Sequence, residues 1–415
     1  GGGGGGGGAR AADKGSGAKP KGGKKGPVRV MILMSDTGGG HRASAEALKG
    51  GFEALYGKKG YEVSVVDLWM NHTPWPYNQL PKSYSFLVKN GWMWASLYKS
   101  TSNMGTPQML KAIGTQVARR VHAAFEEYRP DVVVSVHPLM QHVPLRVMHL
   151  KGLEGKIPFA TVVTDYATAH PTWFHKRANF CCVPTDTVAA EGRQAGLRAD
   201  QIRQYGLPIR VAFADARKLN KRALRARLGM DARLPAVIIV GGGEGMGPLT
   251  QTVEALEALI GRSGGRAPLG QVVVICGRNR RLVDDLSSRE WRMPVHAQGF
   301  VSNMVEWMCA CDCIVTKAGP GTIAESLICG LPLILNNYIP GQEFDNIAQV
   351  TDNKVGIFET DPPKIAAKVA HWFGPGKAER EDISKRAREL GKPHATFDIV
   401  RDLAALEAKA VPAWS

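Results

Sequence analysis

The chain has 415 residues, a length that favours two domains over a single core. Lys and Arg outnumber Asp and Glu by 53 to 37, and the formal net charge of +16 predicts an anionic partner such as a membrane surface or a phosphorylated ligand. Nucleic acid is disfavoured, because the basic residues are dispersed and no helix-turn-helix, zinc-finger or RNP-type motif is apparent. No window has the roughly 18 uninterrupted apolar residues of a membrane-spanning helix.

The seven cysteines are scattered through apolar runs, which favours reduced thiols in a cytosol-like or stromal compartment. Cys309, Cys311 and Cys313 alternate in the sequence MCACDC and do not form the C-x-x-C pairs that are typical of a structural zinc site. We interpret them as small core residues and expect neither a metal site nor a resident cofactor.

Residues 1–27 are of low complexity, with eight glycines followed by a lysine-rich run. Such a segment cannot bury a core, so we expect it to be disordered. A basic, acid-poor leader is typical of the remnant of an organelle transit peptide, and a solvated linker is the alternative. In either case its charge favours contact with an anionic bilayer.

From Val28 onward, apolar strand-like runs alternate with amphipathic helices, a pattern that predicts parallel sheets covered by helices. Residues 28–208 contain predicted strands at 28–34, 61–67, 131–136, 157–163 and 180–183. Residues 209–390 contain predicted strands at 236–240, 271–276, 295–298, 313–316 and 331–335. We expect an α/β protein with two Rossmann-like domains that face each other across a cleft, and a final helix within 391–415 that packs back on the first domain.

The first strand leads into the stretch SDTGGGH, residues 35–41, which opens a helix. Its glycines allow a sharp strand-to-helix turn with a backbone that can approach a ligand closely, and Gly39 and Gly40 leave room for an acceptor. His41 then stands at the helix start, where a histidine can act as a general base near neutral pH. The alternative is a tight turn that carries a surface histidine.

Residues 69–108 interrupt the alternation with a proline-broken aromatic stretch that holds four of the nine tryptophans, Trp75 among them. Aromatic rings interleaved with lysines are typical of an interfacial membrane anchor or of a groove for an apolar ligand. Ordinary core residues that cap the sheet are the alternative.

A second glycine-rich turn, residues 241–247, follows the first strand of the second domain. Neither this turn nor the first has the G-x-G-x-x-G fingerprint, which disfavours a dehydrogenase. Residues 316–325, TKAGPGTIAE, end another strand and open a helix whose backbone N–H groups suit a diphosphate. Glu325, one turn further, can accept hydrogen bonds from both ribose hydroxyls, and a helix-surface acid is the alternative.

The loop that contains Gln342 and Glu343 follows the next strand and offers donors and acceptors side by side, as sugar hydroxyls require. A helix cap is the alternative interpretation. Lys317 and Arg278, together with the helix N-termini, can offset the charge of a leaving diphosphate.

Taken in order, the motifs SDTGGGHRASAEAL, DLWMNHTPWPYNQLPKSY, SVHPLMQHVPLRV, HPTWFHK, YGLPIR, GGGEGMGP, ICGRNRRL, TKAGPGTIAES and the GQE loop closely resemble the plant and algal monogalactosyldiacylglycerol synthases. The resemblance runs from about Val28 to the last helix. It implies a GT-B fold and an inverting transfer of galactose from UDP-galactose to 1,2-diacylglycerol at the plastid envelope. It also implies peripheral attachment to anionic lipids, and a homodimer stays open.

The resemblance implies roles for individual residues. His41 is similar to the general base of the family, and three residues fall in motifs on the acceptor and lipid side: His137, Arg146 and Trp173. The residues that look like the UDP-galactose pocket are Gly241, Gly242, Gly243, Glu244, Gly245, Arg278, Lys317, Gly319, Gly321, Thr322, Glu325, Gln342 and Glu343. One departure is the run YATA at 166–169, where the family has a more polar loop.

Three other functions stay open at this point. The donor could be UDP-glucose, because the residues alone do not distinguish an axial from an equatorial 4-hydroxyl. A nucleotide-sugar 2-epimerase would share the fold, but it needs no lipid acceptor, and the aromatic stretch argues against it. A non-catalytic lipid-binding module would not explain why His41 accompanies a complete set of donor-type loops.

Overall fold

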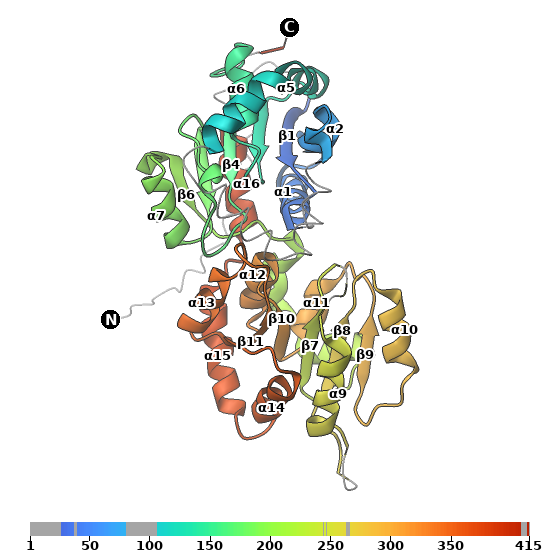
Figure 1. Cartoon of the computed structure of the whole chain (residues 1–415). Coiled ribbons are helices and arrows are strands. Elements are labelled where there is room, and N and C mark those ends of the chain that lie inside the picture. Colours follow the sequence, from blue (N-terminus) through green and yellow to red (C-terminus); the bar gives the residue numbers. More distant parts are fainter. Residues whose placement is uncertain are drawn as a thin grey trace, which may run out of the picture.

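The computed structural model describes residues 26–36, 40–79, 106–243, 245, 247–262, 266–407 and 413–414, with the side chains of 106 and 107 excepted. Two domains are stacked end to end, and each is built on a parallel sheet (Figure 1). All ten predicted strands are present. The glycine-rich leader up to residue 25 and the aromatic stretch from 80 to 105 lie outside the described residues.

The N-terminal domain contains a six-stranded parallel sheet. In spatial order its strands are β2 (Tyr61–Asp67), β1 (Val28–Met34), β3 (Val132–Ser135), β4 (Phe159–Val162), β5 (Phe180–Val183) and β6 (Ile202–Gln204). The three-residue edge strand β6 was not predicted, because IRQ is too short and too polar to stand out from a turn.

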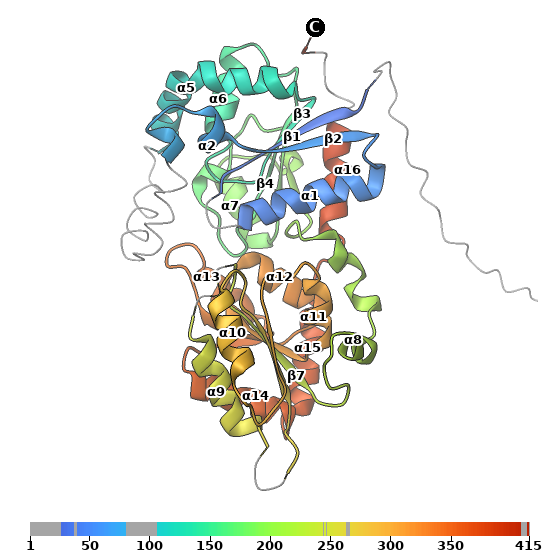
Figure 2. The ribbon, with the colours of Figure 1, turned by 90° about the vertical axis from the view of Figure 1, so that its right-hand side faces the viewer.

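Helices cover both faces of this sheet (Figure 2). They are α1 (Gly40–Tyr56), α2 (Leu68–His72), α5 (Thr106–Tyr128), α6 (His142–Leu150) and α7 (Asp186–Gln194), with 3-10 turns η1 (Tyr77–Gln79), η2 (Pro171–Trp173) and η3 (Ala199–Gln201). The long helix α5 was not predicted from the sequence, since it begins directly after the proline-broken aromatic stretch.

Alternation along β1 explains why an almost continuous apolar run forms one strand. Val30, Ile32 and Met34 belong to the apolar cluster that includes residues of α1, whereas Met31 and Leu33 belong to the cluster that includes residues of α5 and α6. A strand that is covered on both faces needs apolar side chains in both alternating sets.

The C-terminal domain contains a second six-stranded parallel sheet. In spatial order its strands are β12 (Gly356–Phe358), β11 (Leu333–Asn337), β10 (Cys313–Lys317), β7 (Ala236–Val240), β8 (Gln271–Ile275) and β9 (Val295–Gln298). Its helices are α9 (Leu249–Ile260), α10 (Arg280–Ser288), α11 (Met304–Ala310), α12 (Pro320–Cys329), α13 (Asp345–Asp352), α14 (Pro362–Phe373) and α15 (Lys377–Leu390). The short edge strand β12 was not predicted.

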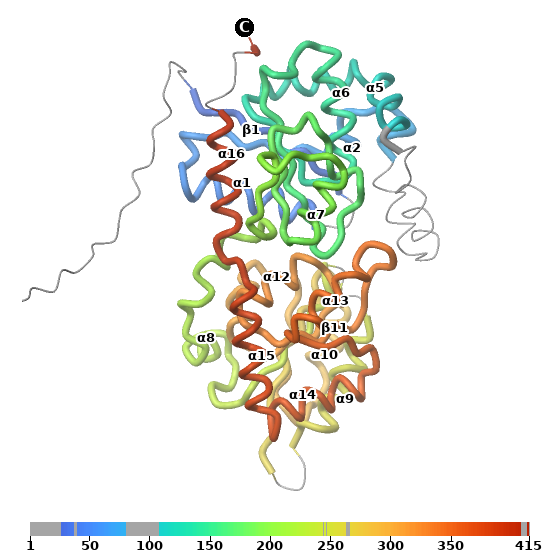
Figure 3. The backbone as a smooth tube through the Cα atoms, turned by 90° about the vertical axis from the view of Figure 1, so that its left-hand side faces the viewer, coloured from blue at the N-terminus to red at the C-terminus, as the bar shows by residue number. Residues whose placement is uncertain are grey.

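The chain crosses between the domains twice. The first crossing leads from β6 through η4 (Val211–Lys218) and α8 (Lys221–Arg227) to β7. At the second crossing, α15 is followed by α16 (Ala395–Glu407), which runs back up along the N-terminal domain (Figure 3). Ile399, Val400 and Leu403 of α16 are fully buried in the cluster shared with α1. Thr396 ties the two crossings together, because its Oγ1 donates to the Ile209 carbonyl at 2.6 Å and accepts from the Ile209 N–H at 2.8 Å.

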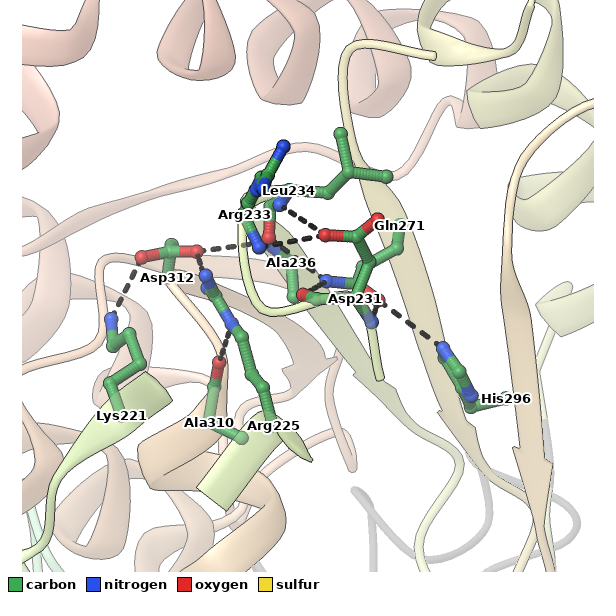
Figure 4. A network of polar contacts seen from close by, with 10 residues as sticks. All are labelled: Lys221, Arg225, Asp231, Arg233, Leu234, Ala236, Gln271, His296, Ala310 and Asp312. Carbon is green, nitrogen blue, oxygen red and sulfur yellow. Dashed lines mark hydrogen bonds and ion pairs between the residues drawn. The ribbon is translucent and has the colours of Figure 1, made fainter. Parts of the chain in front are cut away.

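A polar network holds the first crossing on the C-terminal domain (Figure 4). The carboxylate of Asp312 accepts hydrogen bonds from Lys221 at 2.8 Å, from the Ala236 N–H at 2.8 Å and from Arg225, whose guanidinium also donates to the Ala310 carbonyl at 2.8 Å. Burial would raise the pKa of Asp312, but the cations of Lys221 and Arg225 outweigh burial and lower it. Helix α8 is therefore fixed to the amino-terminal ends of β7 and β10.

Candidate active site

Strand order marks one place in each sheet where a ligand is expected. In the first sheet, the strands after β1 are added on one side of it as β2 and on the other side as β3 to β6, so the strand order reverses between β1 and β3. In the second sheet the strand order reverses between β7 and β10. Open α/β sheets bind ligands beside the carboxyl ends of the strands at such reversals. His41 and His137 follow β1 and β3, and Gly241 and Ala318 follow β7 and β10. Both predicted glycine turns therefore stand at a topological switch point.

His41 lies in the first turn of α1 and is 7% exposed. Its Nδ1 is 2.9 Å from the Val136 carbonyl oxygen and 3.0 Å from Thr164 Oγ1. Because a carbonyl oxygen can only accept, the geometry assigns the proton to Nδ1 and leaves the lone pair on Nε2. Burial lowers the pKa of His41 to about 4, although the hydrogen bond to Val136 acts in the opposite direction. His41 is therefore a neutral imidazole with a free basic nitrogen at pH 7.

His137 lies directly beside it, with the two ring centroids 4.4 Å apart. Its Nδ1 accepts a hydrogen bond from the Leu139 N–H at 3.2 Å, so the ring proton is on Nε2. Burial and the neighbouring His41 lower the pKa of His137 well below its usual value. The structure thus brings together the predicted base and one of the predicted acceptor-side residues.

Trp173 is 6.2 Å from His41 between ring centroids, but it is completely buried. Its indole N–H donates to Asp165 Oδ2 at 2.6 Å, in the segment that follows β4. No surface of the Trp173 ring is accessible in this structure, and its place on the acceptor and lipid side stays a prediction. Trp173 packs beside the ring of His41, and its hydrogen bond fixes the position of the Asp165 carboxylate.

Asp165 is buried as well, and burial raises its pKa to about 6. The hydrogen bonds from Trp173 and from the backbone of His170 lower the pKa, while the carboxylates of Glu191 and Glu343 raise it further. Glu343 belongs to the C-terminal domain, so this electrostatic effect acts between the two domains.

Asp36 follows β1 and is the last described residue before Gly40. The Asp36 N–H donates to Asp67 Oδ2 at 2.9 Å, and Asp67 Oδ1 caps α2 by accepting from the Met70 N–H at 3.0 Å. Arg42 adds an ion pair to Asp36 at 2.6 Å. A Cβ at Gly40 would meet no atom of the described part of the chain within 4 Å, and Gly39 lies outside that part.

The remaining acceptor-side candidates lie elsewhere on the N-terminal domain. Trp75 is 78% exposed between α2 and η1. Arg146 is half-buried on α6 and packs against Gly114 of α5, and its Nε has no hydrogen-bond partner among the described residues. The ring contacts of His41 are with His137 and Trp173, and the structure records none with Trp75.

The glycine turn that follows β7 packs its backbone closely against the turn that follows β8. A Cβ at Gly245 would lie 2.2 Å from the Cys276 carbonyl oxygen, and one at Gly277 would lie 2.4 Å from the Gly243 carbonyl oxygen. Both glycines have positive φ values, +61° and +58°, which only glycine adopts easily. Arg278 is anchored here because its N–H donates to the Gly243 carbonyl at 2.9 Å. Glu244 lies outside the described residues.

The turn after β10 opens α12, with Gly319 as the residue before the helix, and a Cβ at Gly321 would meet no atom of the described residues within 4 Å. Glu325 is 8% exposed, and its Oε1 accepts from Arg210 Nη2 at 2.7 Å and Nε at 3.0 Å. Burial raises the pKa of Glu325, while Arg210 acts to lower it. Thr322 is half-buried in the first turn of the same helix.

Glu343 lies under the same turn. It is 4% exposed, its Oε1 pairs with Lys317, and its Oε2 accepts from the Ile339 N–H at 2.9 Å. Gln342 beside it is half-buried. Lys317 and Glu343 form an ion pair at the carboxyl ends of β10 and β11, so the predicted diphosphate and sugar residues are neighbours.

Sequence reasoning did not single out Thr164 and Arg210, which contact His41 and Glu325, or the exposed Phe300. Thr164 carries no motif signal, and only the packed sheet shows that it reaches His41. Arg210 ends the quoted motif YGLPIR, but its partner Glu325 is 115 residues away. Phe300 is 76% exposed in the loop after β9, where an aromatic ring can stack on a flat ligand. Its position after Gly299 at a strand end was the signal available.

The described ranges were searched for groups of metal-binding side chains and for membrane-spanning helices. There, no three His, Cys, Asp or Glu side chains are grouped so that they could hold a metal ion. The same part of the chain has no helix long and apolar enough to cross a bilayer.

Solved structures with this architecture define the class of protein. MurG of Acinetobacter baumannii matches with a TM-score of 0.57 at 14% identity, covering 91% of this chain and 100% of MurG. A UDP-GlcNAc 2-epimerase of Neisseria meningitidis matches with a TM-score of 0.56 at 13% identity, covering the same shares. The fold is thus GT-B, the two-domain fold of nucleotide-sugar glycosyltransferases. Because an epimerase shares it, the fold alone does not decide between these activities.

Sequence relatives make that decision. The model of the monogalactosyldiacylglycerol (MGDG) synthase family matches residues 41–209, and that of the glycosyltransferase family 28 C-terminal domain matches residues 236–357. Monogalactosyldiacylglycerol synthase 1, chloroplastic, of Arabidopsis thaliana is 52% identical over 385 residues, which cover 92% of this chain and 72% of that protein. The chloroplastic synthase of Spinacia oleracea is 51% identical over 378 residues, which cover 91% and 72%. The chain belongs to the monogalactosyldiacylglycerol synthase family.

Proposed function

We propose that His41 is the general base of a galactosyl transfer from UDP-galactose to 1,2-diacylglycerol, the reaction that makes monogalactosyldiacylglycerol. The observation that carries this role is the fixed tautomer of His41. Its Nδ1 proton is directed to the Val136 carbonyl at 2.9 Å, and burial lowers its pKa to about 4. Nε2 is consequently unprotonated at neutral pH and free to accept a proton.

In the transfer, the free hydroxyl oxygen of diacylglycerol attacks C1 of galactose while its proton passes to Nε2 of His41. The bond between C1 and the β-phosphate oxygen breaks, and its electron pair leaves with UDP. Attack from the face opposite to the leaving group inverts the anomeric centre and gives a β-galactoside. The Val136 carbonyl stabilises the imidazolium that forms, because Nδ1–H donates to it more strongly when the ring is charged.

On the donor side, we assign each group of residues to the part of UDP-galactose that its chemistry suits. The glycine turn of residues 241–247 and the N-terminus of α12 offer backbone N–H groups to the diphosphate, with Lys317 and Arg278 as cations. Glu325 is oriented for the ribose hydroxyls by Arg210. We assign the galactose hydroxyls to Gln342 and to Glu343, which pairs with Lys317, and the uracil ring to the exposed Phe300.

Lipid contact is proposed for the exposed face near Trp75. The side chain of Trp75 is 78% exposed, and Met70 and Met109 nearby on α2 and α5 are 41% and 51% exposed. Apolar and aromatic side chains of this kind insert at the level of lipid headgroups, and the net charge of +16 favours an anionic surface. Together with the chloroplastic relatives, this supports peripheral attachment to the plastid envelope.

The direct test is the identity of the product. The protein is incubated with diacylglycerol in mixed micelles and with either UDP-galactose or UDP-glucose, and the glycolipid is analysed by mass spectrometry and by the coupling constant of its anomeric proton. We expect a β-galactolipid and a clear preference for UDP-galactose. Glucolipid as the main product, or release of free sugar alone, would overturn the proposal.

A further inference from the structure

We propose that Asn346 is a positioning residue that aligns the acceptor domain with the donor turn, and this inference rests on the proposed function above. Asn346 is the second residue of α13, which lies at the face of the C-terminal domain that is turned toward the N-terminal domain (Figure 1). Its side chain is 2% exposed, so it is enclosed between the two domains.

The amide group of Asn346 makes one hydrogen bond to each domain. Its Oδ1 accepts from the Ala167 N–H at 3.1 Å, in the loop that follows β4. Its Nδ2 donates to the Ala318 carbonyl at 2.8 Å, in the donor turn before α12. Ala318 lies between Lys317 and Gly319, two predicted diphosphate contacts. One side chain therefore joins the acceptor-domain loop to the backbone of the donor turn.

The acceptor-domain loop, residues 165–169, is firmly held within its own domain. Trp173 donates to Asp165 at 2.6 Å, Thr185 donates to the Tyr166 carbonyl at 3.1 Å, and the Ala169 N–H donates to Glu191 at 2.8 Å. A shift of this loop caused by Asn346 would therefore also move Asp165 and Trp173. The Trp173 ring lies beside the ring of His41.

Two further contacts reach from the loop to the other domain. Thr168 Oγ1 donates to Asp345 Oδ2 at 2.8 Å. The half-buried ring of Tyr166 packs against the apolar cluster of the C-terminal domain that contains residues of α12. Tyr166 and Thr168 belong to the run YATA at residues 166–169. We define Tyr166, Ala167, Thr168, Asp345 and Asn346 as the interdomain contact.

The interdomain contact is also tied to the sugar loop. Glu343 lies one turn before Asn346, and its carbonyl accepts from the Asn346 N–H at 3.1 Å. The carboxylate of Glu343 in turn pairs with Lys317. Ordering of the donor turn by a nucleotide should therefore stabilise the hydrogen bond to Ala167 and set the distance between His41 and the sugar. Misalignment of reacting groups by a fraction of an ångström lowers the rate more than it lowers binding.

The experiment compares the full-length chain with Asn346→Ala and with Asn353→Ala. Asn353 is an exposed asparagine just after the same helix, whose Nδ2 donates to Gln349 within its own domain at 2.7 Å, so it is a matched control. Three quantities are measured: kcat for galactosyl transfer at saturating substrates, the Kd of UDP by calorimetry, and the hydrogen exchange of backbone amides in residues 165–169 with and without UDP.

We expect UDP to slow amide exchange in residues 165–169 of the unmodified chain, although these residues belong to the other domain. Asn346→Ala should abolish this slowing and reduce kcat by at least about tenfold, because two buried hydrogen bonds are lost, while the Kd of UDP changes by less than about threefold. Asn353→Ala should behave like the unmodified chain in all three measurements.

The proposal is overturned if Asn346→Ala keeps kcat within about twofold, or if it loses UDP affinity and kcat by the same factor, since Asn346 would then only shape the donor turn. If Asn346→Ala does not fold, Thr168→Val carries the test, because it removes an exposed interdomain hydrogen bond. Unchanged kcat and exchange in that variant contradict the proposal. Absence of galactosyl transfer by the unmodified chain counts against the proposed function, and the UDP-dependent exchange then still tests the contact.

Discussion

At the scale of single residues, the protonation state of His41 decides what the site can do. Its Nδ1 contacts a carbonyl and a hydroxyl oxygen, and not the carboxylate that would raise its pKa. The sequence motif identified His41, but not its partners Val136 and Thr164, which come from strand ends about 95 and 123 residues away. A tautomer depends on such neighbours and could not be predicted from the motif.

The pH dependence of the rate follows from this environment. Burial lowers the pKa of His41 to about 4, so the unprotonated base persists as the pH falls from 7 toward 5. The acid limb of kcat/KM for galactosyl transfer should consequently lie well below the ordinary histidine value of about 6.5. Circular dichroism at each pH controls for acid unfolding. A limb at pH 6.5 or above in the folded protein would contradict the neutral, buried state described here.

Glu325 gives a second prediction at this scale. If its carboxylate binds the ribose hydroxyls, Glu325→Ala should weaken UDP binding by about tenfold or more, the loss typical of a hydrogen bond to a charged group. The same variant should lose discrimination between UDP and 2′-deoxy-UDP, measured by calorimetry. Glu381→Ala, an exposed acid on α15, serves as the control. Unchanged UDP affinity in Glu325→Ala would remove Glu325 from the ribose site.

At the scale of elements, the candidate site residues lie at the ends of strands and at the starts of helices. Both glycine turns were predicted from the sequence because a strand, a run of glycines and a helix follow one another directly. The roles of β6, β12 and α5 were not predicted, since two short edge strands and a helix next to an aromatic stretch give little periodic signal. The burial of Trp173 against Asp165 could not be predicted either, because an aromatic residue in a motif looks the same whether it faces lipid or supports a buried carboxylate.

Helix α8 allows a stability prediction for an element. Arg225 is 5% exposed and pairs with Asp312, whose side chain is 13% exposed (Figure 4). Arg225→Ala should lower the free energy of unfolding of the C-terminal domain by about 3 kcal/mol, because it leaves the mostly enclosed carboxylate of Asp312 with a single cation. Urea titration measures the effect. Arg222→Ala, on the exposed side of the same helix, should change it by less than about 0.5 kcal/mol. Equal effects of the two variants would show that the network does not anchor α8.

At the scale of the whole molecule, two sheets present their carboxyl ends to each other. The contacts Ala167–Asn346 and Thr168–Asp345 join the loop that follows β4 to the first residues of α13, so the two domains share one interface. The two-domain architecture could be predicted because each half repeats the alternation of strand and helix. The side chains that connect the halves could not, since Asn346 has no distinctive neighbours in the sequence and acts only across the interface.

The transfer of a proton to His41 is the central claim, and turnover of His41→Ala tests it most directly. The variant, the unmodified chain and the control His149→Ala, an exposed histidine at the end of α6, are assayed with saturating UDP-galactose and diacylglycerol. Loss of a general base should lower kcat by about 10²-fold or more, while the Kd of UDP stays nearly unchanged. Turnover of His41→Ala equal to that of the unmodified chain would contradict the account.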